Sequence, residues 1–128
     1  MTYLPIQTSP EYYAVNGTCT TDGLSLVSTI APNKVGYWWW SYDMAVPGSG
    51  GGVITVRADM AGVGTFYNGT ADEGGSETMY INHMGMVYFY PGLLGPGNIF
   101  YLYVAKAGRP NLTATQFLTW LPTESYRK

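Results

Sequence analysis

Residues 37–40 read Tyr-Trp-Trp-Trp, which is the most unusual local feature of the chain. Aromatic rings can stack on the apolar faces of sugars, and tyrosine and tryptophan also carry a hydrogen-bonding group. Because side chains alternate along a strand, Trp38 and Trp40 are predicted to face the core and Trp39 to face outward. This alternation favours a contact between subunits at Trp39 over a sugar platform, and both interpretations stay open. The candidate sugar-binding aromatics are Tyr37, Trp39, Tyr67 and Tyr80.

Catalytic chemistry would need a nucleophile with its base, paired carboxylates or a metal. His83 is the only histidine, and no neighbour in the sequence orients it, so a surface or interface histidine is favoured over a general base. Asp43 and Asp59 both fall in predicted strands, which leaves a glycosidase-like pair open. We assign no catalytic residue and expect no enzyme. A small β-barrel hydrolase using these three residues is the remaining enzymatic alternative.

Metal and cofactor chemistry has little support in the sequence. Residues 72–77 read Asp-Glu-Gly-Gly-Ser-Glu and could offer oxygens to calcium, but they lack the spacing of a calcium loop. Cys19 is the only cysteine, so it cannot form an intrachain disulfide, and no Cys/His cluster supplies a zinc site. We expect no metal and no cofactor, and we expect Cys19 to be a small, buried or half-buried residue.

The composition excludes several classes of partner. The net charge is −2 and the six basic residues are scattered, so no basic surface for nucleic acid is expected. No apolar run approaches the roughly eighteen residues of a membrane-spanning helix, and the first residues lack the pattern of a signal peptide. Charged residues make up only 11% of the 128 residues, whereas aromatic residues make up 16%. These values favour a neutral, tyrosine-rich surface.

The elements that must position these residues are predicted to be strands. Residues 1–10 are expected to form an extended arm, because Pro5 and Pro10 block regular pairing, and residues 11–128 to form a single domain. Strand-like runs are separated by turn clusters, and no helical periodicity is present. Asn16-Gly17 and Asn68-Gly69 are expected to be turns. The expected strands lie near residues 12–15, 24–30, 35–46, 53–60, 64–67, 79–90, 99–105 and 116–121. The pattern predicts an all-β, antiparallel β-sandwich.

Several of the expected strands are apolar on both faces. Residues 99–105 place Phe100, Leu102 and Val104 on one face and two tyrosines on the other. Only one face of each sheet meets the core of a two-layer sandwich, so the second face needs a cover. Another copy of the chain is the simplest cover. The candidate interface residues are Tyr88, Tyr90, Tyr101, Tyr103, Phe117 and Trp120.

The order of features from residue 35 onward resembles the tumour necrosis factor-like and complement-type globular heads. The stretches that carry the resemblance are Val35-Gly36-Tyr37-Trp38, residues 50–56 (Gly-Gly-Gly-Val-Ile-Thr-Val), residues 95–103 and residues 111–121. The last stretch looks most like the ends of phage versions of this head, found on fibres, tail needles and capsid surfaces. The chain lacks the collagen-like or coiled-coil stalk that normally precedes such heads. The resemblance implies a jelly-roll sandwich that assembles as a homotrimer.

From these observations we expect a non-enzymatic virion structural protein, either a trimeric capsid decoration or a fibre or needle head. It would be made in the host cytoplasm and act at the virion surface. The arm of residues 1–10 would bind other virion proteins, and the outer loops would face solvent or a host-surface glycan. No nucleic acid and no membrane insertion are expected. The alternative is a small lectin that uses its exposed tryptophan and tyrosine side chains.

Overall fold

The computed structural model describes residues 12–32, 34–47, 52–71, 78–89 and 99–121. The predicted arm of residues 1–10, the acidic loop 72–77 and Tyr90 lie outside the described residues. Eight strands are present: β1 Tyr12–Cys19, β2 Ser25–Ile30, β3 Gly36–Val46, β4 Ile54–Met60, β5 Gly64–Ala71, β6 Met79–Phe89, β7 Phe100–Ala105 and β8 Leu112–Leu121.

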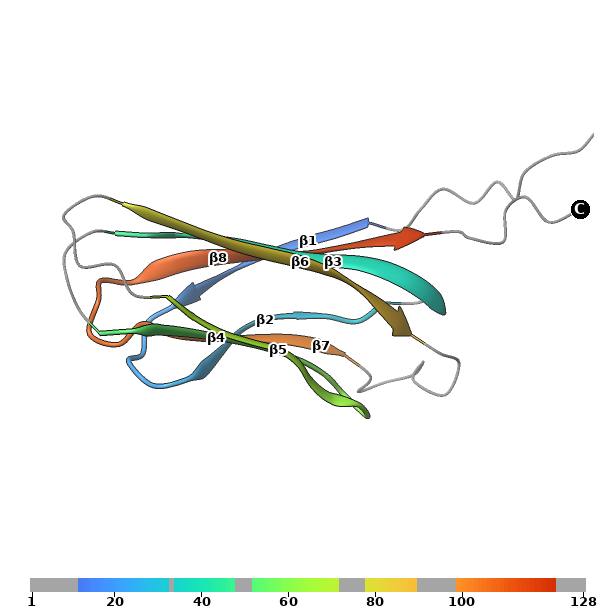
Figure 1. Cartoon of the computed structure of the whole chain (residues 1–128), viewed down its shortest axis with the longest axis horizontal. Coiled ribbons are helices and arrows are strands. Elements are labelled where there is room, and N and C mark those ends of the chain that lie inside the picture. The colour runs from blue at the N-terminus through green and yellow to red at the C-terminus, as the bar shows by residue number, and fades with distance from the viewer. Residues whose placement is uncertain (1–11, 33, 48–51, 72–77, 90–98, 122–128) are drawn as a thin grey trace, which may run out of the picture.

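The strands form two antiparallel sheets of four that face each other as two layers (Figure 1). Sheet A has the order β1-β8-β3-β6, and sheet B has the order β2-β7-β4-β5. The predicted all-β sandwich is therefore confirmed. Along the chain, every connection passes from one sheet to the other, except the β4–β5 connection within sheet B.

The core lies between the sheets and follows the alternation read from the sequence. Trp38, Trp40 and Tyr42 of β3 are almost fully buried, as are the alternate residues of β4 and β7. At its centre, Trp40 Nε1 donates a hydrogen bond to Gln116 Oε1 at 2.9 Å. Gln116 Nε2 donates in turn to Ser28 Oγ at 3.0 Å, which joins sheet A to sheet B. A buried amide is tolerated here because its polar atoms have partners.

The prediction of turns at the two Asn-Gly pairs was wrong. Asn16 and Gly17 lie within β1, paired with Thr115 and Ala114 of β8. Asn68 and Gly69 lie within β5, paired with β4. Gly17 is needed for close packing instead: a Cβ there would lie 1.7 Å from the carbonyl oxygen of Val27. The last strand also begins earlier than predicted, at Leu112 rather than near residue 116.

The two long sides of the sandwich differ. At one side the edge strands β1 and β2 approach so closely that Gly17 lies against the backbone of Val27. At the other side the edge strands are β5 and β6, and aromatic rings rather than backbone fill the space between them. The two sheets are thus in backbone contact along the β1–β2 side, whereas side chains separate them along the β5–β6 side.

Candidate functional site

The outer face of sheet A carries a group of exposed apolar side chains. We call the outer patch the surface formed by the exposed side chains Tyr37, Trp39, Met84, Met86 and Tyr88 and the half-buried Phe117. Trp39 is 39% exposed, and Met84 and Met86 are each 56% exposed. Large apolar side chains gathered in this way on one sheet face are typical of an interaction surface.

The strand register makes the outer patch continuous. Trp39 lies beside Met86, and Tyr37 lies beside Tyr88, with their ring centroids 4.8 Å apart. Phe117 pairs with Ser41, which in turn pairs with Met84. The patch ends at a polar row in which Asp43 pairs with Asn82 and Thr115. One end of the outer face of sheet A is therefore aromatic and methionine-rich, and the adjoining part is polar.

The outer face of sheet B has a different chemistry. Tyr101 and Tyr103 are half-buried on this face, and the Arg57 guanidinium lies 4.6 Å from the centre of the Tyr103 ring. Arg57 also forms an ion pair with Asp59 at 3.1 Å, and the Thr65 hydroxyl donates to the same carboxylate at 2.7 Å. Side chains of β4 and β5 thus cover part of the outer face of sheet B, which the sequence analysis expected another copy of the chain to cover.

The predicted interface residues do not share one surface. Tyr88 and Phe117 lie on the outer face of sheet A, whereas Tyr101 and Tyr103 lie on the outer face of sheet B. Trp120 packs against the core, and its Nε1 donates a 2.8 Å hydrogen bond to the carbonyl oxygen of Val35. A single interface can include Tyr88 and Phe117. Met84 and Met86 lie on the same outer face as Tyr88, as strand alternation predicts.

The predicted sugar-binding aromatics are also separated. Tyr37 and Trp39 are neighbours on the outer patch. Tyr80 is 76% exposed, but it lies six residues along β6 from Met86, the partner of Trp39. At strand spacing this separates Tyr80 from Trp39 by about 20 Å. Tyr67 does not face outward and contributes to a pocket instead.

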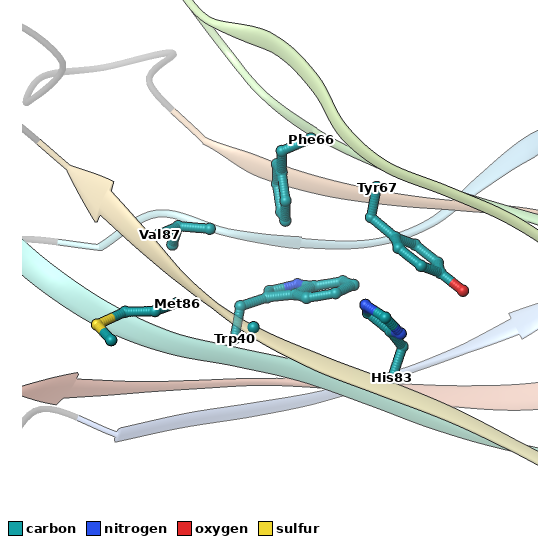
Figure 2. Close-up of a pocket in the computed structure, with 7 residues that line it drawn as sticks. Trp40, Phe66, Tyr67, His83, Met86 and Val87 are labelled. Carbon is teal, nitrogen blue, oxygen red and sulfur yellow. The ribbon is translucent and has the colours of Figure 1, made fainter.

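The pocket lies between the edge strands β5 and β6 and has a volume of about 130 Å³. Figure 2 shows Trp40, Phe66, Tyr67 and His83 turned toward one another, with Met86 turned away. The rings of Tyr67 and His83 are stacked, with their centroids 4.2 Å apart. The rings of Trp40 and Phe66 meet edge to face, with their centroids 5.0 Å apart. The lining residues are Trp40, Phe66, Tyr67, His83, Gly85, Met86 and Val87.

A register shift in sheet B builds one wall of this pocket. Ala58 pairs with Tyr67 and Asp59 pairs with Thr65, so Phe66 is an extra residue in β5. Such a bulge lets consecutive side chains turn to the same side of a strand. The sequence gives no signal of this shift, which is why Phe66 was not identified as a site residue.

Tyr42 is buried next to the pocket, with its ring against those of Trp40 and Tyr67. Burial, followed by the hydroxyl–hydroxyl contact with Tyr67 at 3.5 Å, raises the pKa of Tyr42 far above its usual range. The phenol therefore stays protonated at neutral and moderately alkaline pH.

The residues considered for catalysis are not brought together. Asp43 lies on the outer face of sheet A, Asp59 lies on the outer face of sheet B, and His83 lies at the pocket. Two carboxylates on opposite faces of a sandwich cannot act on one glycosidic bond. Among the residues that the structure describes, no three histidine, cysteine or acidic side chains gather as metal ligands would. Within the same ranges no helix has the length and hydropathy needed to cross a membrane.

No protein-family description matches the chain, and no curated protein has a significantly similar sequence.

Proposed function

We propose that this chain is a non-enzymatic structural protein of a virus particle that acts as a homotrimer at the particle surface. The outer patch of sheet A is the observation that carries the proposal. Its exposed aromatic and methionine side chains are the residue types enriched in protein–protein interfaces, and charged residues are absent from it. The trimer would place the patch of each subunit against a neighbouring subunit.

The strand order supports the resemblance on which the viral role rests. The two sheets have the orders β1-β8-β3-β6 and β2-β7-β4-β5, and the chain crosses between them. An eight-stranded jelly roll is likewise built from two facing sheets. We infer this topology for the domain. The resemblance of residues 111–121 to the ends of phage versions of this head then favours a capsid decoration or a fibre or needle head.

A charge placed on the outer patch tests this proposal. Met86→Lys puts an ammonium group at the centre of the proposed interface, whereas Leu26→Lys makes a similar change at an exposed residue of sheet B. We expect Met86→Lys to lower the sedimentation mass toward the monomer and Leu26→Lys to leave it unchanged. A Met86→Lys protein that sediments like the unchanged chain, with an intact circular dichroism spectrum, would refute the proposed interface.

A small lectin is the second candidate, and one observation favours it. Tyr37 and Trp39 lie side by side on a low-charge face, as a sugar-stacking platform requires. In this function the patch stays open to solvent in a monomer. A screen of immobilised glycans with the natural chain and Trp39→Ala tests it, with binding lost in the variant as the expected result.

A further inference from the structure

The pocket between β5 and β6 shares only Met86 with the outer patch and has no role in the proposed function. Two glycines shape it. A Cβ on Gly69 would lie 2.2 Å from the Tyr67 hydroxyl oxygen, so glycine allows the Tyr67 ring to lie along its own strand and stack on His83. Gly85 pairs with Trp40 on the inward side of β6, and no atom lies within 4 Å of where its Cβ would be.

Position 85 therefore borders open space that a larger side chain would enter. Gly85 does not have the positive φ that would require glycine, so the strand geometry itself accepts other residues there. Glycine within a strand costs stability because it has no side chain to pack and restricts the unfolded chain least. A strand glycine that faces an unfilled pocket is consistent with a binding site for a ligand group.

The size and lining of the pocket define the group that fits. A volume of about 130 Å³ is close to that of a cavity of roughly 150 Å³ known to hold a benzene ring. Phe66, Val87 and the edge of Trp40 provide apolar contacts for such a ring. Polar atoms are available from His83, which is exposed at the rim.

The ring contacts in the pocket favour an inserted aromatic group over a stacked sugar. The Trp40 side chain is only 1% exposed, and it is already in contact with Phe66. One face of Tyr67 is covered by His83. A sugar platform needs a broad, open aromatic face, whereas a ring inserted edge-on can contact several aromatic walls at once.

We propose that the pocket between β5 and β6 binds one phenol-sized aromatic group, with its polar substituent near His83. The group is either a free small phenol or the side chain of a tyrosine in a peptide. The two sources share one chemistry, an apolar ring with a single hydroxyl. This inference does not depend on the proposed trimer.

Titration of the full-length chain with p-cresol, followed by amide and His83 ring signals in NMR, tests the proposal. Gly85→Val fills the pocket with a residue that suits a strand, and Gly23→Val is the matched control because its Cβ also meets no atom within 4 Å. We expect p-cresol to shift signals of residues 83–87 and to bind Gly85→Val at least about tenfold more weakly, since the valine occupies its place. Gly23→Val should bind as the natural chain does.

A capped glycine–tyrosine–glycine peptide distinguishes the two sources. Binding of p-cresol alone assigns the pocket to a free phenol, and binding of both assigns it to a peptide tyrosine. The proposal is overturned if p-cresol does not bind, if it binds natural chain and Gly85→Val equally, or if methyl β-glucoside shifts these signals and p-cresol does not.

Discussion

At the residue scale, Gln116 is a polar side chain at the centre of an otherwise apolar core. Its amide accepts a hydrogen bond from Trp40 and donates one to Ser28, so it holds the two sheets in register. Gln116→Leu keeps a similar volume but leaves the Trp40 Nε1–H buried without its acceptor. We expect the free energy of unfolding to fall by about 2–3 kcal/mol, because a buried donor loses its partner.

Urea unfolding followed by tryptophan fluorescence measures this change. Thr113→Ala, an exposed substitution on the same strand, is the control and should change the free energy of unfolding by less than about 0.5 kcal/mol. Equal stability of Gln116→Leu and the natural chain would contradict the role assigned to the amide.

The raised pKa of Tyr42 predicts that the folded chain loses stability at alkaline pH. A tyrosine in the unfolded chain ionises with a pKa of about 10. In the folded chain, burial and the Tyr67 hydroxyl hold the pKa of Tyr42 above that value. The folded-state pKa is the higher one, so the contribution of Tyr42 is complete below about pH 10 and is lost as the pH rises further.

Tyr42→Phe removes this ionisation from the unfolded chain. We therefore expect the urea midpoint to fall less between pH 9 and pH 11 in Tyr42→Phe than in the natural chain. Identical falls in the two proteins would show that another group controls the alkaline transition.

At the element scale, Gly17 and Gly85 make a matched pair of strand glycines. A Cβ at position 17 would collide with the Val27 carbonyl, while a Cβ at position 85 would enter open space. We expect Gly17→Ala to destabilise the protein by at least about 2 kcal/mol, since β1 must move away from β2. Gly85→Ala should leave stability unchanged or raise it by up to about 1 kcal/mol.

Thermal unfolding of the two variants by circular dichroism compares them directly. Equal shifts of the melting temperature in Gly17→Ala and Gly85→Ala would contradict the difference in packing between the β1–β2 side and the β5–β6 side of the sandwich.

The strands themselves were largely predictable because their burial follows a period of two. In β3 and β4 the inward residues, such as Trp38, Trp40 and Val56, are those that alternation assigns to the core. The two Asn-Gly pairs were misread because strand pairing outweighed local turn propensity, and at Gly17 close packing against Val27 also requires glycine.

The candidate sites were only partly predictable. Trp39 could be identified as outward-facing from its neighbours, but nothing in the sequence assigns Tyr88 and Tyr101 to different sheets. That assignment depends on which strands pair. The pocket depends on a bulge at Phe66 and on the meeting of β5 and β6, consecutive strands that lie at the edges of different sheets, so periodicity within one strand cannot reveal it.

At the scale of the whole molecule, the two outer faces are unequal. Sheet B presents an ion pair and an arginine over Tyr103, so its tyrosines have partners within the chain. Sheet A presents Trp39, Met86 and Tyr88 with substantial exposure. In a chain with only 11% charged residues, such a face left in contact with water favours association. This asymmetry is the reason for placing the subunit contact on sheet A.

The native mass of the unmodified chain, measured by light scattering across a range of concentrations, tests this account most directly. A single chain has a mass of 14.0 kDa. We expect a stable species of about 42 kDa, three times that mass, as a closed homotrimer would give. A species that stays at the mass of one chain at every concentration would contradict it, and would leave the outer patch as a surface open to ligands.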